Sequence, residues 1–157
     1  MSLYTTESGC RFCLLIGREV ESYIVFEDEV SLTFLDYRPL FPGHCLVVPK
    51  DHYETIVDLP INLIAPLFNN VQLVAQAVEN GLKAEGSFVA INNRVSQSVP
   101  HLHIHVVPRR RRDGLRGFFW PRQPYEDEDT ILKIQNLLRS SIAKLQAQKR
   151  KKRCSLA

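Results

Sequence analysis

The sequence lacks any uninterrupted apolar run that approaches the roughly 20 residues needed to span a membrane. Its first ten residues, MSLYTTESGC, have neither a basic start nor a long apolar stretch, so they do not resemble a secretory signal. We therefore expect no membrane partner and a cytoplasmic, reducing environment. In that environment the four cysteines of the chain are expected to stay reduced rather than to form a disulfide framework.

Internal repeats, low-complexity blocks and a dividing linker are also missing. A chain of 157 residues is long enough for one domain with a substantial core but short for two. Hydrophobic residues make up 45% and charged residues 24%, which is typical of a globular protein. We expect a single domain over residues 1–148 and a basic, disordered tail over residues 149–157.

The net charge is only +3, but the positive charge is unevenly placed. Residues 109–112 form one run of four arginines, and residues 149–153 form a second basic run. Positive charge beside a candidate site favours an anionic small molecule as the ligand, although the first run is equally consistent with a solvated surface. No separate DNA-binding module accompanies the tail, so we do not expect nucleic acid as a partner.

The spacing of apolar residues predicts five strands and two main helices. The strands are expected on both sides of a turn at 27–29 within 22–35, and at 44–48, 87–91 and 101–107. One helix is expected at 61–83, with Asp58 as its N-cap and Pro60 in its first turn, and another from about 126–129 to 145. Strands joined mostly by turns indicate an α+β domain with an antiparallel sheet.

Three of the five histidines occupy alternate positions in the segment His101-Leu102-His103-Ile104-His105. Successive side chains of a strand point to opposite faces, so a strand here places the three imidazoles on one face. Imidazoles arranged in this way can ligate a metal, attack an electrophile or transfer protons near neutral pH. A polar strand face without a role is the alternative, but it gives no reason for clustering most of the histidines.

Residues 97–108 (QSVPHLHIHVVP) closely resemble the signature of the histidine triad (HIT) family, in which three histidines alternate with apolar residues after Gln-Ser/Thr-Val. Residues 34–50 (FLDYRPLFPGHCLVVPK) resemble the segment that closes the nucleotide pocket in that family. The resemblance extends from about residue 10 to residue 145. It implies a HIT-like α+β fold, a nucleotide substrate and a homodimer. Residues 117–122 (GFFWPR) look more like the dinucleoside polyphosphate hydrolases and phosphorylases of the family.

The same resemblance implies roles for individual residues. His103, the central histidine, is the implied nucleophile that attacks an α-phosphorus and carries a covalent nucleotidyl group, as a neutral imidazole can near pH 7. His105 and His44 are expected to place hydrogen-bond donors at the phosphate or the leaving group. The expected substrate contacts are Asp36 with the ribose hydroxyls, and Gln97, Ser98 and Asn92 or Asn93 with the phosphate oxygens.

Some of these roles have alternatives. The stretch from Asn92 to Ser96 is shorter than the family pattern and contains no glycine. Either Asn92 or Asn93 is expected to supply the amide, and either tolerates the positive φ that a glycine would adopt. Capping of a loop is the alternative role for Asp36. A position at a strand end without substrate contact is the alternative for His44.

Cys10 and Cys13 form a CxxC pair, which supplies half of a tetrahedral metal site. In several HIT-related proteins, a histidine after the Val-Val-Pro strand and the first triad histidine complete such a site. The corresponding residues here are His52 and His101, so we expect structural zinc at these four positions. The alternative is a pair of reduced thiols without metal, with His101 hydrogen-bonded inside the site.

The sequence thus predicts an enzyme, namely a nucleotide hydrolase or nucleotidyltransferase that cleaves phosphoanhydride or phosphoramidate bonds through His103. Dinucleoside polyphosphates are the expected substrate class, ahead of nucleoside phosphoramidates. A phosphorylase that uses inorganic phosphate instead of water as the acceptor is the nearest alternative. A nucleotide-binding or sensing protein with little turnover is the alternative from another class.

Overall fold

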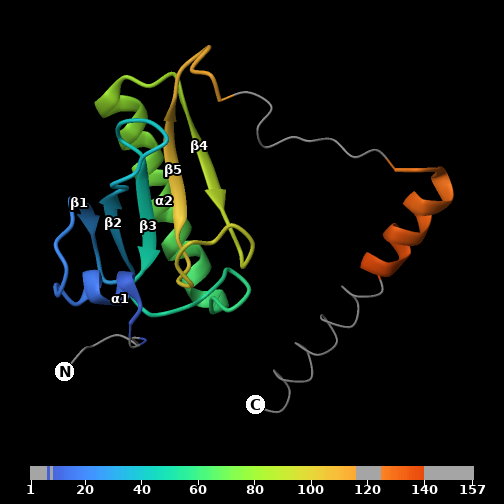
Figure 1. Cartoon of the computed structure of the whole chain (residues 1–157), viewed down its shortest axis with the longest axis horizontal. Coiled ribbons are helices and arrows are strands. Elements are labelled where there is room, and N and C mark those ends of the chain that lie inside the picture. The colour runs from blue at the N-terminus through green and yellow to red at the C-terminus, as the bar shows by residue number, and fades with distance from the viewer. Residues whose placement is uncertain (1–6, 8, 116–124, 140–157) are drawn as a thin grey trace. The chain divides into compact units, whose positions relative to one another are not determined.

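The structure is a computed structural model that describes residue 7, residues 9–115 and residues 125–139 of the chain. The chain divides into two compact units, one ending at Asp113 and the other beginning at Gly114. The first unit contains an antiparallel sheet, a long helix and a short helix (Figure 1). All the site residues expected from the sequence lie in this unit.

Five strands form the sheet in the order β1-β2-β3-β5-β4. They are β1 (Ile24–Glu27), β2 (Ser31–Leu35), β3 (Cys45–Pro49), β4 (Gly86–Ile91) and β5 (Ile104–Arg109). Every neighbouring pair is antiparallel. The predicted α+β class with a five-stranded antiparallel sheet is therefore confirmed. Because β5 lies between β3 and β4, the histidine motif enters the sheet near its centre.

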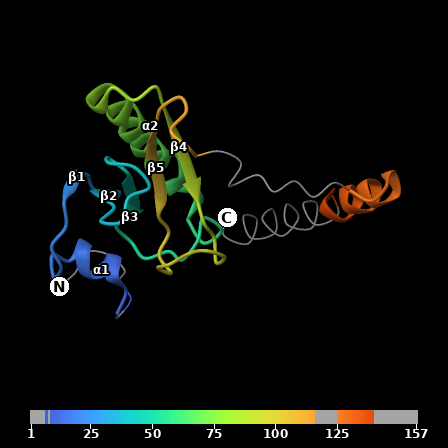
Figure 2. The ribbon, with the colours of Figure 1, turned by 45° about the horizontal axis from the view of Figure 1, so that its top comes forward.

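The long helix α2 (Ile61–Leu82) covers one face of the sheet, as Figures 1 and 2 show. Its buried apolar residues recur at helical spacing and pack on strand residues of the same face. This core cluster includes Leu67, Val71, Val74 and Val78 of the helix and Cys45, Val47, Ile104 and Val106 of the sheet. In length and composition α2 is apolar enough to cross a membrane. Core helices of soluble proteins pass the same test, so this is weak evidence for a membrane span.

A second core lies on the opposite face and involves a short helix, α1 (Arg11–Ile16), that the sequence analysis did not predict. Alternation along β3 divides its side chains, because Leu46 and Val48 join this cluster whereas Cys45 and Val47 face α2. Six residues are too few to display helical periodicity, which explains the omission. The sheet is thus covered on both faces at its centre.

The predicted N-cap of α2 is wrong. Pro60 occupies the N-cap position and makes no side-chain cap. The carboxylate of Asp58 instead accepts hydrogen bonds from the backbone N–H of Thr55 at 3.0 Å and from its hydroxyl at 2.6 Å. Aspartate side chains readily close local turns, and here the turn before the helix competes successfully for the carboxylate.

In the second unit, residues 128–139 are helical. The carboxylate of Asp127 accepts a hydrogen bond of 2.7 Å from the backbone N–H of Thr130, which fits the predicted acidic start of this helix. Apolar side chains including Ile131, Ile134, Leu137 and Leu138 are exposed on it. The predictions for residues 117–122, for the end of the helix at 145 and for the tail at 149–157 lie outside the described residues.

Candidate active site

The histidine motif lies only partly in a strand, and it begins in a bend at His101. β5 begins at Ile104 rather than at residue 101. The backbone before β5 bonds to a loop instead of a strand, because the N–H of Leu102 donates to the carbonyl of Tyr53 at 2.6 Å. The expected alternation nevertheless persists. Leu102 and Ile104 lie in the core on the α2 side, whereas His101 and His103 contact Phe12 of α1 on the other side.

Four side chains from three segments meet on the α1 side, namely those of Cys10, Cys13, His52 and His101. The Sγ atom of Cys13 lies 3.3 Å from Nδ1 of His52 and 3.6 Å from Nδ1 of His101. The Sγ atom of Cys10 lies 3.5 Å from Nδ1 of His101. Tetrahedral bonds of ordinary length to zinc separate a sulfur from a nitrogen by about 3.6 Å. This cluster therefore has the donor types and the spacing of a tetrahedral zinc site.

The far nitrogens of the two cluster histidines differ in their contacts. Nε2 of His101 donates to the carbonyl oxygen of Pro49 at 2.9 Å, whereas Nε2 of His52 lies 2.7 Å from a carboxylate oxygen of Glu7 without the geometry of a hydrogen bond. A proton on Nε2 leaves the lone pair of Nδ1 directed at the thiols, which is the arrangement of metal-ligating histidines. Burial also lowers the pKa of His101 to about 4, so this imidazole is neutral at pH 7.

His103 is buried, and its ring is held in one orientation. Its Nδ1 lies 2.7 Å from the carbonyl oxygen of His101. A carbonyl oxygen only accepts hydrogen bonds, so Nδ1 carries a proton, and in the neutral ring Nε2 presents its lone pair. The ring of Phe12 packs edge to face against the imidazole, with 5.3 Å between the centroids. The imidazole of His103 is thus held in one orientation from two sides.

A hydrogen bond between ring nitrogens connects His44 with His105. The backbone N–H of Leu40 donates to Nδ1 of His44 at 3.2 Å, so Nε2 of that ring carries the proton. Nε2 of His44 lies 3.0 Å from Nδ1 of His105 and donates to it. Nε2 of His105 therefore carries the next proton. It is buried and has no hydrogen-bond partner among the residues that the structure describes.

The imidazoles of His44 and His105 are both neutral at pH 7. Burial first, and then the neighbouring His103 and His44, lower the pKa of His105 to about 4. Burial also lowers the pKa of His44, although a carboxylate oxygen of Asp36 at 3.6 Å from its Nδ1 acts in the opposite direction. The N–H of His105 is thus an unsatisfied donor, which an anionic oxygen in the site would satisfy.

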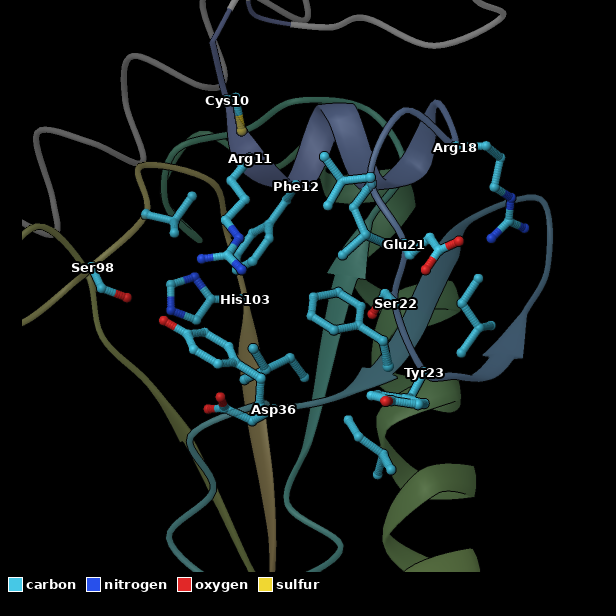
Figure 3. Close-up of a pocket in the computed structure, with 18 of the residues that line it drawn as sticks. Cys10, Arg11, Phe12, Arg18, Glu21, Ser22, Tyr23, Asp36, Ser98 and His103 are labelled. Carbon is cyan, nitrogen blue, oxygen red and sulfur yellow. The ribbon is translucent and has the colours of Figure 1, made fainter.

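A pocket of about 1170 Å³ opens beside these histidines. Figure 3 shows His103 between Ser98, Asp36 and the two α1 side chains Arg11 and Phe12. Much of the remaining wall is apolar and comes from α1 and the first strands, including Leu15, Ile24, Phe34, Leu35 and Leu46. Apolar walls together with polar and charged groups suit a ligand that joins a flat apolar group to an anionic group.

The expected substrate contacts are placed differently from one another. Asp36, Ser98, His103 and His105 line the pocket, whereas Asn92, Gln97 and His44 are not among its lining residues. One carboxylate oxygen of Asp36 accepts a hydrogen bond of 2.9 Å from the backbone N–H of Arg38. Asp36 therefore caps its loop, as the alternative interpretation holds, and also borders the pocket.

Side-chain amides of Asn93 and Gln97 attach the loop before the histidine motif to residues 54–56. Gln97 accepts a hydrogen bond of 2.6 Å from the N–H of Arg94 and donates one of 2.7 Å to the carbonyl of Glu54. Asn93 accepts one of 3.0 Å from the N–H of Ile56. The positive φ angles of this loop occur at Arg94 and Ser96 rather than at either asparagine. These contacts between distant segments have no signal in the sequence.

Sequence reasoning missed the contribution of α1 to the pocket. Arg11 and Phe12 both line it, and both lie inside the CxxC segment. The signal was present, because any helix that brings Cys10 and Cys13 to His101 must also bring the two intervening residues close to the motif. Glu7, which contacts His52, was also missed, and it lies outside the CxxC segment.

Comparison with known proteins gives consistent matches. The HIT domain family model matches residues 17–112. Adenylylsulfatase HINT3 of Arabidopsis thaliana is 34% identical over 113 residues, which cover 71% of this chain and 57% of that protein. The asymmetrical bis(5'-nucleosyl)-tetraphosphatase of Schizosaccharomyces pombe is 33% identical over 96 residues, which cover 60% of this chain and 53% of that protein. The chain thus spans little more than half the length of either relative.

Two solved structures extend the comparison to most of the chain. A HIT family member from Bacillus subtilis matches with a TM-score of 0.73 and 32% identity, over 87% of this chain and 96% of that chain. A zinc-bound histidine triad family protein from Mycobacterium smegmatis matches with a TM-score of 0.65 and 36% identity, over 88% of this chain and 96% of that chain. Both share the fold described above.

Proposed function

Because this chain belongs to the HIT domain family, we propose that it cleaves nucleotides at the α-phosphate through a covalent nucleotidyl group on His103. The observation that carries the proposal is the hydrogen bond of 2.7 Å between Nδ1 of His103 and the carbonyl of His101. In the neutral imidazole this bond leaves the lone pair on Nε2, and His103 lines the pocket. Relatives named as an adenylylsulfatase and a bis(5'-nucleosyl)-tetraphosphatase support a nucleotide hydrolase in general.

In the proposed first step, Nε2 of His103 attacks the α-phosphorus while the bond to the leaving group breaks. The carbonyl of His101 stabilises the positive charge that develops on the imidazole ring, because it accepts a hydrogen bond from the N–H at Nδ1. The N–H of His105 donates to an oxygen of the phosphate, where negative charge increases in the transition state. Water then attacks the phosphorus, the P–N bond breaks and a nucleoside monophosphate leaves.

The substrate class follows from the same site. We propose dinucleoside polyphosphates first, with the apolar wall of the pocket contacting a base and Asp36 accepting from ribose hydroxyls. Incubation with diadenosine tetraphosphate, with and without inorganic phosphate, tests this proposal. AMP and ATP as products indicate hydrolysis, whereas ADP and ATP indicate phosphorolysis. If neither this compound nor an adenosine phosphoramidate is turned over while AMP binds tightly, the protein is a nucleotide-binding protein.

We also propose that the cluster of Cys10, Cys13, His52 and His101 holds structural zinc. The sulfur–nitrogen distances and the hydrogen bond from Nε2 of His101 to the carbonyl of Pro49 support this assignment, as does the zinc-bound relative from Mycobacterium smegmatis. Four protein ligands leave no open coordination position, so zinc would supply structure rather than a reactive water.

We propose further that the chain forms a homodimer through β4. This strand is at the edge of the sheet, and Val89 on it is 42% exposed. Edge strands present unpaired backbone groups that pair readily with a second chain. Sedimentation should give about 36 kDa, twice the 18.0 kDa of one chain. Val89→Arg should shift the mass to that of a monomer, whereas Val57→Arg in an exposed loop should not. A monomer mass for the unmodified protein contradicts the proposal.

A further inference from the structure

Two arginines flank Tyr37 at the solvent end of the pocket. Cζ of Arg11 lies 4.8 Å from the centroid of the Tyr37 ring, which places the guanidinium in a cation–π contact. Hydrogen bonds from Arg38 and then from Arg11 lower the pKa of the Tyr37 phenol, so both cations reach the same side chain. Tyr37 is 67% exposed, and both Tyr37 and Arg11 line the pocket together with His103.

The position of Arg11 makes its charge available to a ligand. Among the described residues that line the pocket, Arg11 and Arg18 are the two with a permanent positive charge. Arg18 is paired with the carboxylate of Glu27. Arg11 has no carboxylate partner in the part of the chain that the structure describes, and Figure 3 shows its side chain extending from α1 toward His103.

The histidines of the site do not supply such a charge. His105 and His44 are neutral at pH 7 for the reasons given above, and Asp36 adds a negative charge beside them. A leaving group that consists of further phosphates would bring several negative charges to this end of the pocket. Guanidinium groups bind phosphate oxygens through two parallel hydrogen bonds, and this geometry suits a chain of phosphates.

We propose that Arg11, oriented by Tyr37, binds the phosphates beyond the α-phosphate and selects nucleotides with a polyphosphate leaving group. The inference rests on the proposed function, since it names the substrate class of the same site. When Nε2 of His103 forms its bond to the α-phosphorus, the bond from phosphorus to the bridging oxygen breaks. The departing phosphate oxygen keeps the electron pair, and the guanidinium of Arg11 stabilises its charge. An uncharged amine leaving group would not need this cation.

The test compares two substrates that share the adenylyl group and differ in the leaving group. Arg11→Met should lower kcat/KM for diadenosine tetraphosphate by about 10- to 100-fold, the range expected for a lost charged hydrogen bond. For adenosine 5'-phosphoramidate, kcat/KM should change by less than about threefold. Arg11→Lys should recover part of the lost activity, because it keeps the charge without the planar stacked group.

Arg18→Met is the matched control, because it removes the same charge from the same pocket at a position already paired with Glu27. It should leave the ratio of the two kcat/KM values unchanged. Melting temperature and metal content should be measured for each variant, since Arg11 lies between two cysteines of the metal cluster. An equal loss for both substrates in Arg11→Met, or no loss for either, would overturn the inference.

Failure of the proposed function gives a different result. If the unmodified protein turns over neither substrate, the proposed function is wrong whatever Arg11 does. The role of Arg11 is then decided by calorimetric affinities for ATP and AMP. Arg11→Met should weaken ATP binding by at least about tenfold more than AMP binding. An unchanged ratio of the two affinities would overturn the inference in that case.

Discussion

Replacement of His103 by alanine is expected to lower kcat for diadenosine tetraphosphate by about 10⁴- to 10⁶-fold, as for nucleophiles in other enzymes with covalent intermediates. The variant lacks Nε2 of His103, which in the neutral ring presents its lone pair at the pocket because Nδ1 donates to the backbone carbonyl of His101. Residual activity would come from the remaining donors of the site. Initial rates, followed by separation of the nucleotide products, measure the effect.

His103→Asn is the matched variant for this experiment. Its side-chain amide can still donate to the carbonyl of His101, so it keeps the hydrogen bond while removing the nucleophile. It should be as inactive as the alanine variant but closer to the unmodified protein in melting temperature. His105→Ala should lose less, about 10²- to 10³-fold, because it removes one donor to the phosphate.

A trapped intermediate separates a nucleophile from a general base. Mass spectrometry of protein quenched during turnover should find an adenylyl group on the unmodified protein and on His105→Ala. It should find none on either His103 variant. Activity of His103→Ala within tenfold of the unmodified protein, or an adenylyl group on that variant, would show that the assignment of the nucleophile is wrong.

Short runs rich in apolar, β-branched and aromatic residues were sufficient to predict the strands, and helical periodicity was sufficient to predict α2. The limits of these elements depend on partners that are distant in sequence. The motif strand begins only at Ile104 because residue 102 donates its backbone N–H to Tyr53 instead of to a strand. Asp58 fails as a cap because the hydroxyl and N–H of Thr55 take its carboxylate.

The site could be predicted to a similar extent. The CxxC spacing indicated half of a metal site, and the resemblance to the HIT family supplied His52 and His101 as its other half; the structure brings these four side chains together. Proton positions could not be predicted, because they follow from single contacts such as the N–H of Leu40 on His44. The bracing contacts of Gln97 and the stacking of Arg11 on Tyr37 likewise depend on the packed loops.

His101 connects the cluster of two cysteines and two histidines with the proposed nucleophile His103. Its ring nitrogen Nδ1 faces the thiols, whereas its backbone carbonyl accepts the proton of His103. Phe12, which lies between Cys10 and Cys13 in sequence, also packs against both imidazoles. A loss of metal should therefore reach the nucleophile through two contacts, the carbonyl and the aromatic ring.

Protein purified without added zinc is accordingly expected to contain about one zinc ion per chain, and Cys13→Ser less than about a tenth of that. The variant should lose at least about 3 kcal/mol of stability, which lowers the melting temperature by roughly 10 °C. Its kcat should fall more than its KM rises, because the orientation of His103 is disturbed while the apolar wall of the pocket remains.

Cys45→Ser is the control, because Cys45 is also buried but lies in the other core, away from the cluster. It should keep the zinc.

Without metal, burial raises the pKa of Cys13 to about 11, so zinc binding at pH 7 must release the proton of this thiol. The affinity for zinc should therefore rise with pH. Less than about a tenth of an equivalent of zinc in the unmodified protein, with no change of stability or kcat in Cys13→Ser, would mean that the cluster works as a hydrogen-bonded support for His103 without metal.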